Sequence, residues 1–159
     1  MASDQSLCQL QLNIPANLGF LALVSEGLRV VLEQAAGVPE KETLLYNVQL
    51  AAQEACTNIV NHAYGDRLPP GMVTSEGRIA IEINLTPDRL TVQLEDTGAA
   101  FALPAPGSIE LPAEPQEHGY GLFLMYALVD EVIYQPLQGK NRWMLIKRLV
   151  GRGEPAVSN

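Results

Sequence analysis

Four polar side chains recur along one predicted helix at a spacing that brings them together. The set comprises Glu54, Asn58, Asn61 and His62. These positions are i, i+4, i+7 and i+8, so a period of 3.6 residues puts all four on one face. A carboxylate can accept a proton, and a carboxamide oxygen is a hard, neutral ligand for a metal ion. The pair Glu54 and Asn58, one turn apart, therefore predicts a site for a magnesium-bound nucleotide.

Two glycine-containing motifs farther along the chain are candidates for the remaining contacts of a nucleotide. In the first, Asp96 ends a predicted strand and Gly98 follows it, so the carboxylate can accept a hydrogen bond from an exocyclic amine while the glycine lets a base approach the backbone. In the second, Gly119 and Gly121 open a predicted helix, whose free N–H groups and dipole suit phosphate. Each motif also has a plainer interpretation. An acidic residue followed by glycine is a common turn, and glycine often marks the start of a helix.

Other side chains beside these motifs have mainly structural interpretations. A lone histidine such as His62 or His118 is more often a surface or packing residue than a catalyst, although His118 precedes the glycine pair and can reach a phosphate there. Cys56 has no basic activator in the sequence, so we interpret it as a packing residue. Tyr64 is interpreted as an anchor for the helix end.

Alternation and helical periodicity predict the elements that position these motifs. The predicted strands span residues 7–13, 78–85, 89–95, 130–135 and 143–149. The predicted helices span residues 17–36, 40–63 and 122–129. Five residues of the second helix are expected to face the core, namely Leu45, Val48, Ala52, Ala55 and Ile59. Pro15 and Gly37 are expected to end the first strand and the first helix, and residues 102–118 to form a long loop.

Composition limits the classes of function. With 159 residues and 47% apolar content, the chain fits one globular domain over residues 1–150, followed by a flexible tail over residues 151–159. A net charge of −8 excludes a surface that follows nucleic-acid phosphates. The sequence predicts no membrane span and no signal peptide. Two cysteines without metal-ligand spacing favour a reduced, cytoplasmic location.

The order and spacing of the three motifs resemble those of the GHKL ATPase superfamily. The segments Glu54-Ala-Cys-Thr-Asn58, Asp96-x-Gly98-x-x-Phe101 and Gly119-Tyr-Gly121 are most similar to those of its anti-sigma-factor serine/threonine kinases. The resemblance extends from the first strand to Leu149. It implies an α+β two-layer sandwich of the Bergerat ATP-binding type, in which helices cover one face of a mixed, mostly antiparallel sheet.

The resemblance also implies roles for individual residues. Glu54 would be the general base, Asn58 the Mg²⁺ ligand, and Asp96 with Gly98 the adenine contact. The other implied nucleotide-binding residues are Asn61, His62, Phe101, His118, Gly119, Tyr120, Gly121 and Leu122. The implied cofactors are ATP and Mg²⁺, and the reaction is phosphorylation of a STAS-type anti-anti-sigma protein. A sigma factor would be the inhibited client, and a homodimer is left open because relatives often pair.

The chain departs from many of these relatives in its long loop. Residues 102–117 contain no Lys or Arg but do contain Glu110, Glu114 and Glu117. Charge on the γ-phosphate would then be met by Mg²⁺, backbone amides and His118. This departure keeps a second hypothesis open, in which the domain binds ATP or ADP and switches partners without transferring phosphate. A third hypothesis is a domain of this fold that binds no nucleotide.

Overall fold

A five-stranded sheet forms one layer of the molecule. The computed structural model of the chain describes residues 5–64, 77–102, 104 and 120–149. Its strands are β1 (Cys8–Pro15), β2 (Arg78–Leu85), β3 (Arg89–Asp96), β4 (Glu131–Leu137) and β5 (Lys140–Arg148). They lie in the order β1-β2-β3-β5-β4, and all four pairings are antiparallel. The two-layer α+β fold is therefore confirmed, with an antiparallel sheet throughout the described strands instead of a mixed one.

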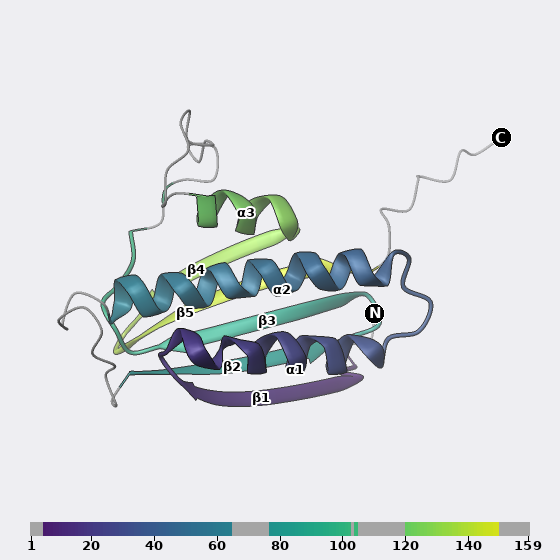
Figure 1. Cartoon of the computed structure of the whole chain (residues 1–159), viewed down its shortest axis with the longest axis horizontal. Coiled ribbons are helices and arrows are strands. Elements are labelled where there is room, and N and C mark those ends of the chain that lie inside the picture. The colour runs from purple at the N-terminus through teal and green to yellow at the C-terminus, as the bar shows by residue number, and fades with distance from the viewer. Residues whose placement is uncertain (1–4, 65–76, 103, 105–119, 150–159) are drawn as a thin grey trace.

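In the described part of the chain, three α-helices form the second layer (Figure 1). They are α1 (Leu21–Glu33), α2 (Lys41–Asn58) and α3 (Tyr120–Leu128). The first packs on β1 and β2, the second lies centrally between the other two, and the third packs on α2 and β4. The central helix thus contacts α1, α3, η2 and β5.

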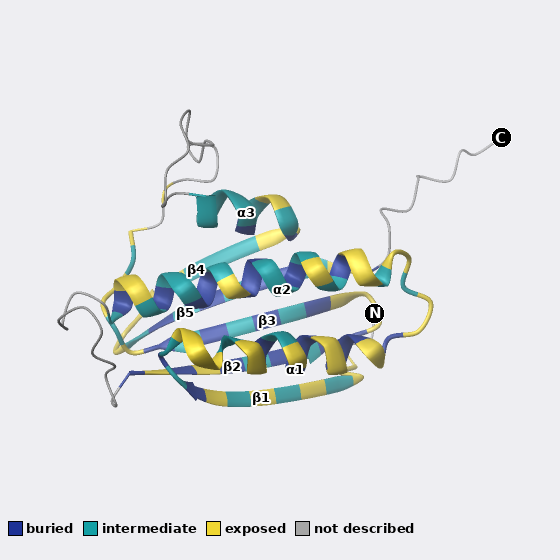
Figure 2. Cartoon of the chain, viewed as in Figure 1, coloured by how far each residue is buried: buried dark blue, intermediate teal, exposed yellow. Residues whose placement is uncertain are grey.

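The core lies between the layers, and strand alternation explains its composition. In β2 and β3 every second side chain is buried, and the intervening ones are exposed or half-buried (Figure 2). The buried set of these two strands is Ile79, Ile81, Ile83, Leu85, Leu90, Val92, Leu94 and Asp96. A period of two is expected when only one face of a sheet is covered. Asp96 is the one member of this set that is not apolar, so the row of buried side chains ends in a carboxylate.

The first predicted helix has different ends in the structure. A 3₁₀ turn, η1 (Leu18–Phe20), precedes α1, because the side chain of Asn17 accepts a hydrogen bond from Gly19 N at 2.8 Å. The α-helix ends at Glu33, three residues before the predicted end. Gly37 adopts φ 67°, but it does so in the connection after the helix and not at its last turn. The prediction of residues 17–36 as one helix was therefore too long.

The second predicted helix continues past α2 as a π-helical segment, η2 (Ile59–Ala63). The hairpin between β4 and β5 is tighter than predicted, because only Gln138 and Gly139 separate the strands. Gly139 adopts φ 78°, which suits glycine in a two-residue turn. Strand β5 therefore begins at Lys140 and not at Trp143. The proposed tail over residues 151–159 lies outside the described residues.

Candidate functional site

The helix α2 presents Glu54 and Asn58 toward α3 and the sheet end, respectively. Its opposite side is apolar, as predicted. Val48, Ala52, Ala55 and Ile59 are buried, and Leu45 is partly buried against the core. Burial also acts on Glu54, whose carboxyl pKa it raises above the usual value. A carboxylate with a raised pKa is a better proton acceptor near neutral pH.

The π-helical segment changes the predicted helix face at its end. Asn61 and His62 are both exposed, whereas Ala63 is buried. Because a π-turn takes more residues than an α-turn, the 3.6-residue spacing does not continue beyond Asn58. His62 still lines a pocket with Asn58 and Asp96, and no hydrogen bond joins the side chain of Asn61 to another described residue. π-segments of this kind are frequent at functional sites.

Tyr64 anchors the end of this helix, as the sequence suggested. Its hydroxyl donates to the carbonyl oxygen of Arg78 at 2.9 Å and accepts from the backbone N–H of Thr97 at 3.0 Å. One side chain thereby joins the helix end to the start of β2 and to the turn after β3. This connection fixes the Asp96–Gly98 motif next to the helix that carries Asn58.

Asp96 lies at the end of β3 and is only 3% exposed. Its Oδ1 accepts hydrogen bonds from Gly98 N and from Asn141 Nδ2, each at 2.9 Å. Burial raises the pKa of the Asp96 carboxyl, and these two hydrogen bonds lower it in part. The hydrogen bond from Gly98 N to Asp96 Oδ1 forms the common turn that an acidic residue followed by glycine predicts. The turn and a carboxylate directed at a ligand are therefore compatible.

Gly98 is required by a close approach of two backbones. A Cβ atom built on it would lie 2.5 Å from both the Cβ and the carbonyl oxygen of Ala63. The next residue, Ala99, donates its N–H to the same carbonyl at 3.0 Å. The glycine therefore lets the turn after β3 pack directly on the end of the central helix.

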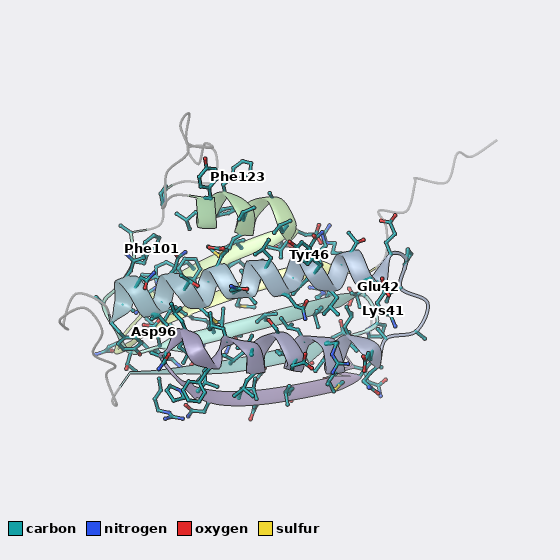
Figure 3. The ribbon with its side chains drawn as sticks, viewed as in Figure 1. Lys41, Glu42, Tyr46, Asp96, Phe101 and Phe123 are labelled. Atoms are coloured by element: carbon teal, nitrogen blue, oxygen red, sulfur yellow. The ribbon has the colours of Figure 1, made fainter. Side chains whose placement is uncertain are left out.

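An aromatic cluster closes the pocket between these motifs. The pocket is lined by Asn58, Ile59, His62, Ala63, Asp96, Ala99, Phe101, Tyr134 and Trp143. The Phe101 ring lies 5.4 Å from that of His62 and 5.8 Å from that of Trp143, centroid to centroid. The backbone N–H of Phe101 donates to the Tyr134 hydroxyl at 2.7 Å. Figure 3 shows Asp96 and Phe101 at the same end of α2.

The remaining free volume of this pocket is small, about 10 Å³. That is room for about one water molecule. A purine ring system needs many times this space, so it enters only if residues that line the pocket move apart. Four of the lining residues, namely Asn58, His62, Asp96 and Phe101, are among those that the sequence predicted for nucleotide binding.

The start of α3 packs directly on Glu54. A Cβ atom on Gly121 would lie 2.5 Å from Glu54 Oε2, so only glycine fits without moving the carboxylate. Tyr120 and Leu122 are half-buried on either side of it, and Leu122 packs against the core. His118 and Gly119, two further predicted nucleotide-binding residues, lie outside the described residues.

The donor set fits a magnesium nucleotide. Asn58 Nδ2 is buried and has no hydrogen-bond partner, so this N–H group is available to donate to an oxygen of a ligand, and only the side-chain oxygen could bind the metal ion. Within the described residues, no group of three or more His, Cys, Asp or Glu side chains is arranged to hold a metal ion. Mg²⁺ is commonly held by one or two protein oxygens together with waters and substrate phosphates. A single ligand from Asn58 is consistent with that mode and not with a cage of side chains.

Sequence reasoning missed three residues of the site, namely Tyr134, Asn141 and Trp143. Asn141 and Trp143 occupy alternate positions of β5, and both are buried. A polar Asn in the apolar alternation Asn141-Trp143-Leu145 was the available signal. Starting the strand at Trp143 instead of Lys140 excluded Asn141 from that pattern.

Cys56 is a packing residue, as predicted. It is fully buried in the core, and burial raises the pKa of its thiol to about 12. A thiol with such a pKa is protonated at neutral pH and does not act as a nucleophile. Among the described helices, none is long and apolar enough to cross a membrane.

Comparisons with known proteins agree with the geometry. The family model of the histidine kinase-like ATPase domain matches residues 14–147. "Serine-protein kinase RsbW" of Bacillus cereus strain AH187 is 31% identical over an alignment of 135 residues, and the match covers 78% of this chain and 75% of that protein. The protein of the same name from Bacillus mycoides strain KBAB4 is 30% identical over the same lengths.

One solved structure shows the same fold. It is the crystal structure of the RsbU and RsbW domains of Rv1364c from Mycobacterium tuberculosis, with a TM-score of 0.60 and 20% identity. The match covers 89% of this chain and 32% of that longer chain. At this identity the likeness concerns the fold alone.

Proposed function

Because this chain belongs to the histidine kinase-like ATPase family, and within it to the anti-sigma kinases of the GHKL superfamily, we propose that it binds Mg-ATP and phosphorylates a serine or threonine of a STAS-type anti-anti-sigma protein. In its other role it would bind a sigma factor and hold it inactive. A sigma factor as client puts the proposed activity in the bacterial cytoplasm. The proposed site lies within one protomer, so a homodimer of this chain would carry two such sites.

The observation that carries the proposal is the meeting of three motifs at one end of α2. Asn58 and Asp96 line one pocket, and Gly121 packs on the carboxylate of Glu54. The proposal is supported by this arrangement, in which Glu54 and Asn58 lie on the last two turns of α2 and Asp96 lines the same pocket as Asn58. The buried Asn58 Nδ2, which has no hydrogen-bond partner, supports a ligand that offers an acceptor atom at this place.

Each of these residues has a definite task in the proposed reaction. Bound Mg²⁺ would neutralise charge on the phosphates, with the side-chain oxygen of Asn58 as its protein ligand. Asp96 would accept a hydrogen bond from the adenine amine. Glu54 would take the proton of the partner's hydroxyl group, which suits a carboxylate whose pKa is raised by burial. The close packing of Gly121 on Oε2 orients that carboxylate.

A radiolabel transfer assay tests the proposal. The full chain is incubated with γ-labelled Mg-ATP and its cognate STAS protein, and label on the STAS protein is the expected result. Glu54→Gln should abolish transfer while leaving ATP affinity within a few-fold of the wild type. Glu42→Gln, at the exposed first turn of the same helix, is the matched control and should transfer label normally. Bound nucleotide without any transfer would refute the kinase.

The acidic composition of residues 102–117 supports one alternative. Without Lys or Arg in residues 102–117, the chain offers no cation there for the γ-phosphate. In the alternative, ATP and ADP select between partners and no phosphate is transferred. The Glu54→Gln variant separates the two functions, because a pure switch would exchange its partners normally without this carboxylate.

A further inference from the structure

Asn141 is a buried polar residue directly opposite Asp96. It lies at the second position of β5, in register with Asp96 at the last position of β3. It is 4% exposed and Asp96 is 3% exposed. Among the described residues, buried polar side chains are few, and Thr86 is the third of them. A buried carboxamide beside a buried carboxylate is costly unless both are hydrogen-bonded.

The amide group of Asn141 connects the carboxylate to the turn that follows it. Its Nδ2 donates to Asp96 Oδ1 at 2.9 Å and to the carbonyl oxygens of Gly98 at 3.0 Å and Ala99 at 3.3 Å. A carboxamide nitrogen carries two hydrogens, so the Ala99 carbonyl shares one of them. These acceptors lie on both arms of the turn after β3. The side chain therefore fixes the shape of the turn as well as the direction of the carboxylate.

The two oxygens of Asp96 differ in their partners as a result. Oδ1 accepts from both Asn141 Nδ2 and Gly98 N. Oδ2 receives no hydrogen bond from the described part of the chain. Since Asn141 offers only its N–H side to Oδ1, it favours the ionised carboxylate, which accepts and does not donate. Asp96 is thereby left with one acceptor oxygen for a ligand in the pocket that it lines.

We propose that Asn141 is a positioning residue that sets the preference for adenine by holding Asp96 as an oriented acceptor. The proposal rests on the proposed binding of ATP. Adenine has an amine at the position where guanine has a carbonyl oxygen. An Asp96 oxygen fixed opposite that position accepts a hydrogen bond from the amine of adenine. With guanine, the same oxygen would face a carbonyl oxygen, so two acceptors would oppose each other without a hydrogen bond. Without Asn141, the Asp96 carboxyl can rotate or become protonated, and a protonated carboxyl can donate to guanine.

The test compares nucleotide affinity and the Asp96 pKa in matched variants of the full chain. Asn141→Leu keeps the volume of the side chain and removes the donor, whereas Asn141→Ser keeps one donor. Thr86→Val is the control, because it removes a buried hydroxyl that donates to Asp88 at the opposite end of the β2–β3 hairpin. Affinities for Mg-ATP and Mg-GTP are measured by calorimetry, and the pKa of Asp96 by carbon-detected NMR. His62 lines the same pocket, so its titration is followed in the same spectra.

We expect Asn141→Leu to weaken ATP binding by about tenfold or more, since the lost bond is to a charged group. GTP binding should change much less, so the ratio of the two affinities falls. The pKa of Asp96 should rise, and Asn141→Ser should recover part of both changes. Thr86→Val should lower thermal stability without altering the ratio or that pKa.

Two results would overturn the proposal. One is a folded Asn141→Leu protein that keeps both the ATP-to-GTP ratio and the Asp96 pKa of the wild type. The other is an equal loss of preference in Thr86→Val, which would make the effect one of general stability. A wild-type protein that binds no nucleotide refutes the proposed function and the adenine preference together. The Asp96 pKa then still decides whether Asn141 positions the carboxylate, and if Asn141→Leu does not fold, Asn141→Ser supplies the same comparison.

Discussion

Replacing Gly98 by alanine should disrupt the joint between the sheet and the central helix. The added Cβ would lie 2.5 Å from the Ala63 carbonyl oxygen and 2.7 Å from its carbonyl carbon, which are backbone atoms. Non-bonded heavy atoms pack at about 3.5–4.0 Å, so the turn must move by about an ångström. That movement breaks the Ala99 N–H bond to the Ala63 carbonyl. Overpacking costs about 1–3 kcal/mol and the lost bond about 1 kcal/mol, so we expect a loss of about 2–4 kcal/mol.

Chemical unfolding followed by fluorescence measures this loss, and calorimetry measures Mg-ATP affinity in parallel. For a domain of this size each kcal/mol lowers the Tm by about 2–4 °C. Gly37→Ala is the control, because a Cβ there meets no atom within 4 Å and the cost comes only from its φ of 67°. That cost is about 1–2 kcal/mol and should leave nucleotide binding unchanged. A Gly98→Ala protein with wild-type stability and wild-type ATP affinity would refute the reasoning.

Three further predictions concern Glu54, Gly121 and the cysteines. Gly121→Ala should cost little stability, because the atom that the new Cβ would crowd is the flexible end of Glu54. Phosphoryl transfer should nevertheless fall at least tenfold, because that carboxylate is displaced. An equal loss of stability in Gly98→Ala and Gly121→Ala would contradict this prediction. Burial raises the folded-state pKa of Glu54 above 4.5, so the wild type loses stability as pH rises through that pKa. Glu54→Gln should therefore unfold at higher denaturant than the wild type at neutral pH and equally below the unfolded-state pKa, and a gain that persists in acid would argue against desolvation. Alkylation at mildly alkaline pH, followed by mass spectrometry, should label half-buried Cys8 in the folded protein and Cys56 only after unfolding. Rapid labelling of both cysteines would show instead that the core opens.

The elements that the sequence predicted best were those whose pattern depends on a single buried face. Strands β2 and β3 begin at the predicted residues, because alternation is uninterrupted within each of them, from Ile79 to Leu85 and from Leu90 to Leu94. The ends of α1 were harder to predict, since Asn17 starts a 3₁₀ turn by a side-chain hydrogen bond that apolar periodicity does not reveal. Ala35 continues the apolar pattern but lies beyond the helix, where the connection buries it.

The candidate site was predictable where its residues are local in sequence. Glu54 and Asn58 lie one α-turn apart, and this geometry holds because α2 extends to Asn58. Asn61 and His62 follow in a π-segment, which no spacing rule for an α-helix anticipates. Asn141 and Tyr134 join the site through strand pairing and through a hydrogen bond to Phe101, so their membership depends on register across the sheet. Such contacts follow from the tertiary fold and not from local pattern.

The position of Trp143 allows its intrinsic fluorescence to report on both ligand binding and unfolding. It is the single tryptophan of the chain, it is 2% exposed, and its ring centroid lies 4.6 Å from that of Tyr134 and 5.8 Å from that of Phe101. An indole so enclosed should emit at short wavelength in the native protein and shift to longer wavelength on unfolding. Displacement of the Phe101 ring by a base would change the same emission without unfolding. Spectral position and intensity of one native residue can therefore distinguish ligand entry from denaturation, with no label attached.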